Sequence, residues 1–211
     1  MPIVAAVVVY ALWNTPIVYP LKIFVVFLHE VSHGLAAILT GGRIERIELS
    51  AAEGGLCVTR GGSRFLILNA GYLGSLLWGA LFLVVGARSR RDRELVAMIG
   101  LVTVAVTLLY VRTAFGFAYG LAAGAALLLV AMRFPPAVAD AVLRVIGAVS
   151  CLYAVWDIAS DVLLRNPRGS DAAALARLTG VPATAWGLLW TAVSLAVSIA
   201  ALRIAWRGGG S

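Results

Sequence analysis

Long apolar runs separated by short polar gaps make up most of this chain. The runs cover residues 3–19, 21–40, 65–87, 95–111, 114–132, 138–164 and 183–205. A membrane-spanning helix needs about 20 mostly apolar residues. The first run lies at the lower length limit and is broken by Asn14, Thr15 and Pro16, so whether it crosses a membrane is left open. The pattern predicts an all-α, polytopic membrane protein with about six transmembrane helices.

One segment, residues 43–62, departs from this pattern. Ile47 and Leu49 alternate with charged neighbours, and a second alternating stretch begins at Leu56. Between them, Glu-Gly-Gly at 53–55 is typical of a turn. Period-two alternation on both sides of a glycine-containing turn indicates a short β-hairpin. An ordinary polar loop is the alternative interpretation.

Composition supports one membrane domain. Of the 211 residues, 62% are hydrophobic and 13% are charged, whereas about a quarter of a soluble domain is charged. We therefore expect residues 1–211 to form a single transmembrane domain, with 43–62 as a hairpin or loop insertion and 206–211 as a short tail.

The formal net charge of +7 is carried by arginine and a single lysine. The arginines fall in the gaps between apolar runs, for example Arg88, Arg90, Arg91 and Arg93. This placement is typical of solvated loop ends beside anionic lipid headgroups. We therefore expect the lipid bilayer as a partner, no nucleic acid, and a multi-pass location in the cell membrane. The sequence does not indicate an oligomeric state.

Glycines recur at four-residue spacing in the run 114–132, at Gly116, Gly120 and Gly124. Small residues at this spacing let two membrane helices approach closely. We expect this ridge to pack inside the monomer; a dimer interface is the alternative.

Both histidines of the chain lie within one apolar run, in the pattern H-E-x-x-H formed by His29, Glu30 and His33. Side chains at i and i+4 share a helix face, so both imidazoles can reach one ion, and the glutamate flanks that face. Ionisable groups inside a membrane span are costly and usually mark a functional site. A structural hydrogen-bonded pair is the alternative, but the pattern favours a Zn²⁺ site with Glu30 as catalytic base.

Catalytic zinc needs a third protein ligand and one open position. The run 138–164 crosses in the same direction as the histidine-containing run, and Asp157 lies at about the same depth as the histidines. We therefore predict the metal ligands His29, His33 and Asp157. Asp161, one turn nearer the interface, is the second choice. Asp171 is the third, because an acidic residue after Ser170 is also explained by helix capping.

Several segments together resemble the site-2 protease family of intramembrane zinc metalloproteases, and within it the compact branch of small peptidase-like proteins. They are "FLHEVSHGLAAILTGG" at 27–42, the hairpin-like segment, "NAGYLGSLLWGALF" at 69–82, a late intramembrane Asp, and "SDAAALARLTGVPATAWGLLW" at 170–190. The resemblance implies His29 and His33 as zinc ligands, Glu30 as general base and a late Asp as third ligand. Better-known members have Gly after that Asp, whereas Asp157 precedes Ile158.

The expected function is hydrolysis of a peptide bond in a membrane-protein or peptide substrate, within or next to the membrane. Zinc would activate a water molecule, and Glu30 would act as general base. Two alternatives belong to other classes: an inactive membrane scaffold or regulator that retains the metal site, and a metal or proton transporter. A transporter would be expected to carry polar residues in several spans, whereas here they concentrate in two.

Overall fold

The fold is described from a computed structural model, for residues 11–13, 15–89, 91–159 and 170–208. Its helices and strands, in chain order, are α2 (Tyr19–Leu39), β1 (Arg43–Ser50), β2 (Gly54–Arg60), α3 (Arg64–Arg88), α4 (Asp92–Tyr110), α5 (Ala114–Arg133), α6 (Pro136–Ala159), α7 (Asp171–Thr179) and α8 (Ala183–Gly208). Within the described residues, six helices are long and apolar enough to cross a membrane: α2, α3, α4, α5, α6 and α8. The predicted all-α membrane fold is confirmed. Most of the apolar run 3–19 and residues 160–164 lie outside the described residues.

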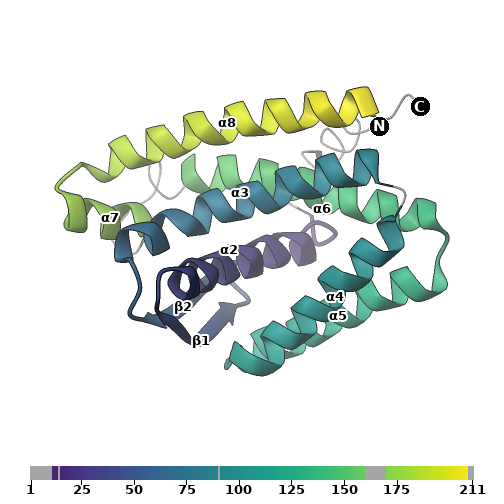
Figure 1. Cartoon of the computed structure of the whole chain (residues 1–211), viewed down its shortest axis with the longest axis horizontal. Coiled ribbons are helices and arrows are strands. Elements are labelled where there is room, and N and C mark those ends of the chain that lie inside the picture. The colour runs from purple at the N-terminus through teal and green to yellow at the C-terminus, as the bar shows by residue number, and fades with distance from the viewer. Residues whose placement is uncertain (1–10, 14, 90, 160–169, 209–211) are drawn as a thin grey trace.

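Helix α3 lies at the centre of the bundle. It packs against α2 on one side and against α6 and α8 on the other, while α4 and α5 form a separate antiparallel pair (Figure 1). The glycine ridge belongs to this pair. A Cβ at Gly120 would overlap Thr107, and one at Gly124 would overlap Val104. The expected packing of this ridge inside the monomer is confirmed.

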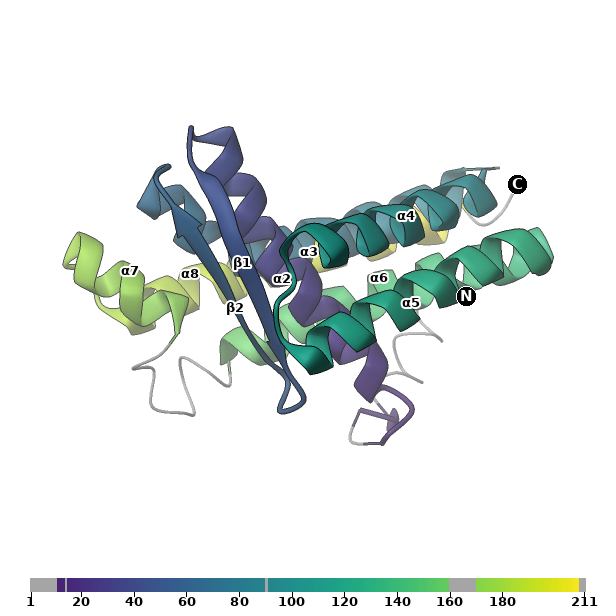
Figure 2. The same cartoon turned by 90° about the horizontal axis from the view of Figure 1, so that it is seen from below.

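The segment after α2 is the predicted β-hairpin. β1 and β2 pair antiparallel, with Ile47 opposite Cys57 and Leu49 opposite Gly55. The hairpin runs back along α2 and packs against it (Figure 2). Gly34 makes this packing possible, because a Cβ there would overlap the Ile44 side chain.

The connection between α4 and α5 closes the outer edge of β1. The backbone N–H of Arg112 donates to the Ile47 carbonyl, with an N–O distance of 3.0 Å. The Thr113 hydroxyl accepts from the Leu49 N–H at 3.1 Å and donates to the Leu49 carbonyl at 2.9 Å. The backbone N–H and C=O groups of Ile47 and Leu49 therefore point away from β2. In an antiparallel pair, the residues directly opposite do the same, so the backbone groups of Cys57 and Gly55 point away from β1. The other edge of the hairpin is therefore formed by these outward-pointing backbone groups of β2.

Replacing Thr113 with Val should loosen the hairpin. Leu49 is buried, so the change leaves a buried N–H and a buried carbonyl without this partner, and we expect a loss of about 1–3 kcal/mol in unfolding free energy. Thr113→Ser keeps the hydroxyl and should lose much less. Unfolding in detergent, followed by circular dichroism, measures both variants, and equal stability of Thr113→Val and Thr113→Ser would contradict this role.

Candidate metal centre

Helix α2 presents the H-E-x-x-H residues on one side of the bundle. The rings of His29 and His33 lie one turn apart, with centroids 4.7 Å from each other. His33 is buried and His29 is half-buried, while the Glu30 side chain between them is buried. The spacing therefore does what the sequence pattern predicts: both imidazoles reach the same point in space.

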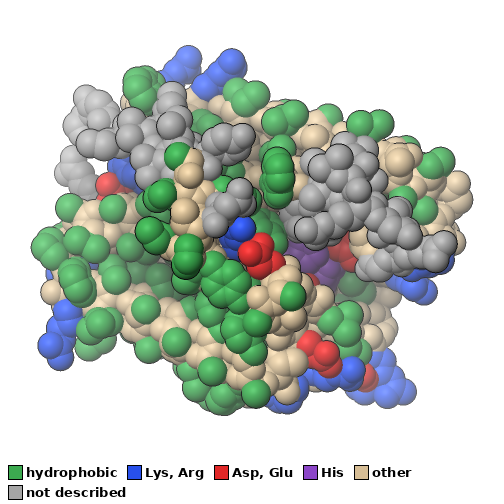
Figure 3. All heavy atoms as spheres, turned by 180° about the vertical axis from the view of Figure 1, so that it is seen from behind, with side chains coloured by type: hydrophobic (Ala, Val, Ile, Leu, Met, Phe, Trp, Pro, Cys, Tyr) green, Lys and Arg blue, Asp and Glu red, His purple; other side chains and the backbone are tan. Residues whose placement is uncertain are grey.

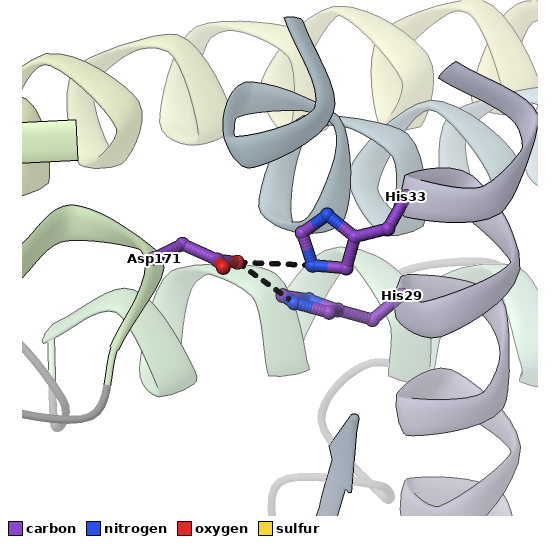
Figure 4. A group of neighbouring side chains, drawn as sticks. All are labelled: His29, His33 and Asp171. Carbon is purple, nitrogen blue, oxygen red and sulfur yellow. Dashed lines mark hydrogen bonds and ion pairs between the residues drawn. The ribbon is translucent and has the colours of Figure 1, made fainter. Parts of the chain in front are cut away.

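The acidic residue that meets these imidazoles is Asp171, at the first turn of α7 (Figure 4). Its Oδ2 atom lies 3.1 Å from His29 Nε2 and 3.1 Å from His33 Nε2. Two tetrahedral ligands about 2.0 Å from one zinc ion would be separated by about 3.3 Å. Over the part of the chain that the structure describes, these three residues form the one group of three or more His, Cys, Asp or Glu donors close enough to share an ion. Two imidazole nitrogens and one carboxylate oxygen at these separations could hold a metal ion.

At the start of α7, Ser170 caps the helix and Asp171 contacts the histidines. The Ser170 side chain accepts a hydrogen bond from the Ala173 N–H and caps the helix. The Asp171 carboxylate is thereby left for the histidines. Burial raises the pKa of this carboxyl, but the charge of His33 and hydrogen bonds from both histidines outweigh burial, so its pKa lies well below the usual value. A carboxylate must likewise be deprotonated to bind a metal.

Neighbouring groups fix the orientation of each imidazole. His33 Nδ1 lies 2.6 Å from the Ile67 carbonyl oxygen, to which it donates if the proton is on Nδ1. That tautomer leaves Nε2 free for a metal. The His29 ring lies edge-to-face against Tyr72, with centroids 4.8 Å apart, and Tyr72 in turn contacts Trp190.

Gly71 of α3 faces the two Nε2 atoms directly. A Cβ at this position would overlap the Nε2 atoms of both His29 and His33. The missing side chain therefore leaves open the space that an ion between these nitrogens would occupy.

Glu30 lies against β2. A Cβ at Gly55 would overlap its carboxylate, and the backbone N–H of Cys57 donates to it. The carboxylate is thus held beside the histidines by a hydrogen bond from a strand. Cys57 is also close, but burial and the nearby Glu30 raise the pKa of its thiol to about 12. A thiol that stays protonated does not compete as a metal ligand.

The histidines, Glu30 and Asp171 line a cavity of about 1270 Å³ between α2, the hairpin, the start of α3, the last turns of α6 and the start of α7. From behind, histidine atoms are visible between acidic and hydrophobic side chains (Figure 3). The cavity supplies room for water and for an extended peptide beside the histidines.

The chain matches the family model described as Peptidase M50B-like over residues 2–201. The chain belongs to the Peptidase M50B-like family. This membership confirms the resemblance to the site-2 protease family. Together with the six candidate spans, it establishes an integral, multi-pass membrane protein. Neither a search of curated proteins nor a search of solved structures found a match.

The third ligand of this M50B-like centre was expected on the run 138–164. Asp157 belongs to the last turns of α6, but its side chain lies outside the described residues, as does all of Asp161. Their assignment as ligands therefore stays a prediction. The acid that the structure brings to the histidines is Asp171, which sequence reasoning ranked last because capping already explained it. A usable signal was present: Ser170 is itself a good cap, so Asp171 was not needed for that task.

Alanine substitutions should separate the candidate ligands. Asp171→Ala removes a carboxylate 3.1 Å from both Nε2 atoms. Loss of a group that only orients a metal ligand typically lowers metal affinity by roughly 10- to 100-fold. Because Asp171 is proposed as a ligand itself, we expect Asp171→Ala to lower zinc affinity by more than this. Asp157→Ala is the matched control and should retain zinc. Metal analysis of the purified variants measures this, and the opposite result would assign the site to Asp157.

Gly71→Ala should abolish metal binding without changing any ligand, because the added methyl group overlaps both Nε2 atoms. Gly54→Ala is the control: a Cβ at Gly54 meets nothing within 4 Å. Zinc titration of the two folded variants measures the difference. Full zinc occupancy in Gly71→Ala would show that the ion lies elsewhere.

Proposed function

We propose that this M50B-like protein is a zinc metalloprotease that hydrolyses peptide bonds within or next to the membrane, with Asp171 as third ligand beside His29 and His33. The observation that carries the proposal is the meeting of three metal donors and a buried glutamate in one cavity. A site that only bound or transported a metal would not need Glu30 in this position. The natural substrate would be a membrane protein or peptide, and the expected location is the cell membrane.

When bound at these donors, zinc supplies a Lewis acid that activates water and polarises a carbonyl group. Glu30 lies next to His29 in the sequence and lines the same cavity. In the proposed reaction its carboxylate accepts the proton of the attacking water and delivers it to the amide nitrogen that leaves. The hydrogen bond from the Cys57 N–H keeps the carboxylate turned towards the cavity.

Substrate binding is proposed to use the edge of β2. A helical substrate has every backbone group hydrogen-bonded and must unwind before its peptide bond can be attacked. The outer edge of β1 is occupied by Arg112 and Thr113, whereas Gly55 and Cys57 of β2 line the cavity. Because the Cys57 N–H already donates to Glu30, a peptide added as a strand at this edge would pair with the backbone groups of Gly55 and with the Cys57 carbonyl. It would also lie beside Glu30.

Glu30→Gln separates the protease from the alternatives. Loss of a general base should lower cleavage by about 10²- to 10⁴-fold, while zinc is retained because Glu30 is not a proposed ligand. Glu45→Gln, on the exposed face of β1, is the matched control. The assay is cleavage of a pool of single-span peptides in lipid vesicles, read by mass spectrometry.

Removing zinc with a chelator should abolish cleavage by the unaltered protein, and returning zinc should restore it. Undiminished activity in Glu30→Gln, or cleavage that persists without metal, would overturn the proposed mechanism. An absence of any cleavage would favour the inactive scaffold or the transporter.

A further inference from the structure

The cavity extends well beyond the metal donors. Lys22, Val26, His29 and His33 lie on one face of α2, and all four line it. Lys22 precedes His29 by seven residues, which corresponds to about 10 Å along a helix. The cavity therefore has a second polar end, formed by the chain's single lysine.

Lys22 is buried at this end, with only 8% of its surface exposed. Its Nζ atom lies 3.4 Å from Glu53 Oε1 and 5.1 Å from the centre of the Trp13 ring. Glu53 is the one acidic partner of Lys22 within 4 Å in the described part of the chain. A buried ammonium group requires an anionic or polar partner, so this end of the cavity is built to hold a carboxylate.

The carboxylate that it holds comes from a strained position. Glu53 lies at the hairpin turn with a φ of 59°, in the left-handed region that non-glycine residues rarely adopt. Its side chain remains 34% exposed, and the 3.4 Å separation is long for a charge-assisted hydrogen bond. The turn itself is held separately, by a hydrogen bond of 2.7 Å from the Tyr19 hydroxyl to the Ala51 carbonyl. Glu53 can therefore leave Lys22 while the hairpin stays in place.

We propose that Lys22 is a carboxylate-binding, specificity-determining residue of the substrate cavity, occupied by Glu53 in the free protein and by a carboxylate of the substrate during cleavage. This inference rests on the proposed protease function. It adds that the protease prefers substrates with a carboxylate at a fixed distance from the scissile bond.

The distance and direction follow from the fold. An extended peptide advances about 3.3 Å per residue, so the 10 Å between Lys22 and His29 corresponds to about three residues. β2 runs from the turn beside Lys22 towards Arg60. We take the substrate to pair antiparallel to β2, as β1 does; it then runs the opposite way, and its C-terminal side points towards Lys22. The carboxylate should therefore lie about three residues after the scissile bond.

Two sources can supply this group: an Asp or Glu side chain, or the free C-terminus of the substrate. Both present the same carboxylate to Lys22. Peptides that carry an acidic or a neutral residue at this position, each with a free or an amidated C-terminus, distinguish them.

The test uses the full-length, zinc-loaded protein and a peptide library in lipid vesicles, with cleavage sites read by mass spectrometry. The unaltered protein should prefer a carboxylate about three residues past the cut by roughly tenfold or more. Lys22→Met should lose the preference, and Lys22→Glu should reverse it towards Lys and Arg. Cleavage by the unaltered protein without a carboxylate preference overturns the inference alone, whereas no cleavage overturns the protease function as well.

A charge-swapped double variant excludes a purely structural role. Lys22→Glu with Glu53→Lys keeps the ion pair and hence the fold, but should retain the reversed preference of Lys22→Glu. If Lys22 only anchors the hairpin turn, the double variant should prefer carboxylates as the unaltered protein does. Arg46→Glu with Glu48→Arg swaps an ion pair on β1 that does not line the cavity. This control should leave the preference unchanged.

Discussion

The structure depends on the burial of two histidines and a glutamate in an apolar helix. Ionisable groups inside an apolar span are costly unless they have polar partners, and each of these three has one within the protein. The partners come from separate parts of the chain: Asp171 from α7, the Ile67 carbonyl from α3 and the Cys57 N–H from β2. The polar residues of α2 thus hold α7, α3 and β2 against it, in addition to its apolar contacts.

Glycines determine how closely these segments approach. Gly71 brings the α3 backbone against both imidazoles, and Gly55 brings β2 against Glu30. Each glycine faces a functional side chain from a different element, so neither belongs to a general packing ridge. The glycines of the α4–α5 ridge allow two helices to pack closely. Gly71 and Gly55, in contrast, leave space free beside the imidazole nitrogens and the Glu30 carboxylate. Small residues therefore serve two distinct purposes in this fold.

Much of the fold can be read from the sequence because its signals are local. Apolar run length predicts the six helices, alternation predicts the hairpin, and the i, i+4 spacing brings His29 and His33 together. The meeting of Asp171 with these histidines is not local. Depth along continuous spans pointed to Asp157, because that reasoning considers only residues within a spanning helix, and Asp171 lies on the short helix α7 between two spans. The contact of Thr113 with Leu49 has no sequence signal either, since a lone threonine in a connection is unremarkable.

The helices α4 and α5 contribute no side chain to the described lining of the cavity, yet they bear on how it is used. Their connection occupies the outer edge of β1, so the two edges of the hairpin are not equivalent. A hairpin with both edges open could take up a peptide on either side, and only one side faces Glu30. In the proposed function, residues 111–113 close the other edge and so leave the edge beside the cavity for an added strand. The same contact ties β1 to the α4–α5 connection, while the hairpin packs against α2, which carries Glu30 and Lys22. In the proposed reaction, α2 sets the separation of Glu30 from Lys22 because it carries both, while the α4–α5 connection determines which edge of the hairpin an added strand can reach.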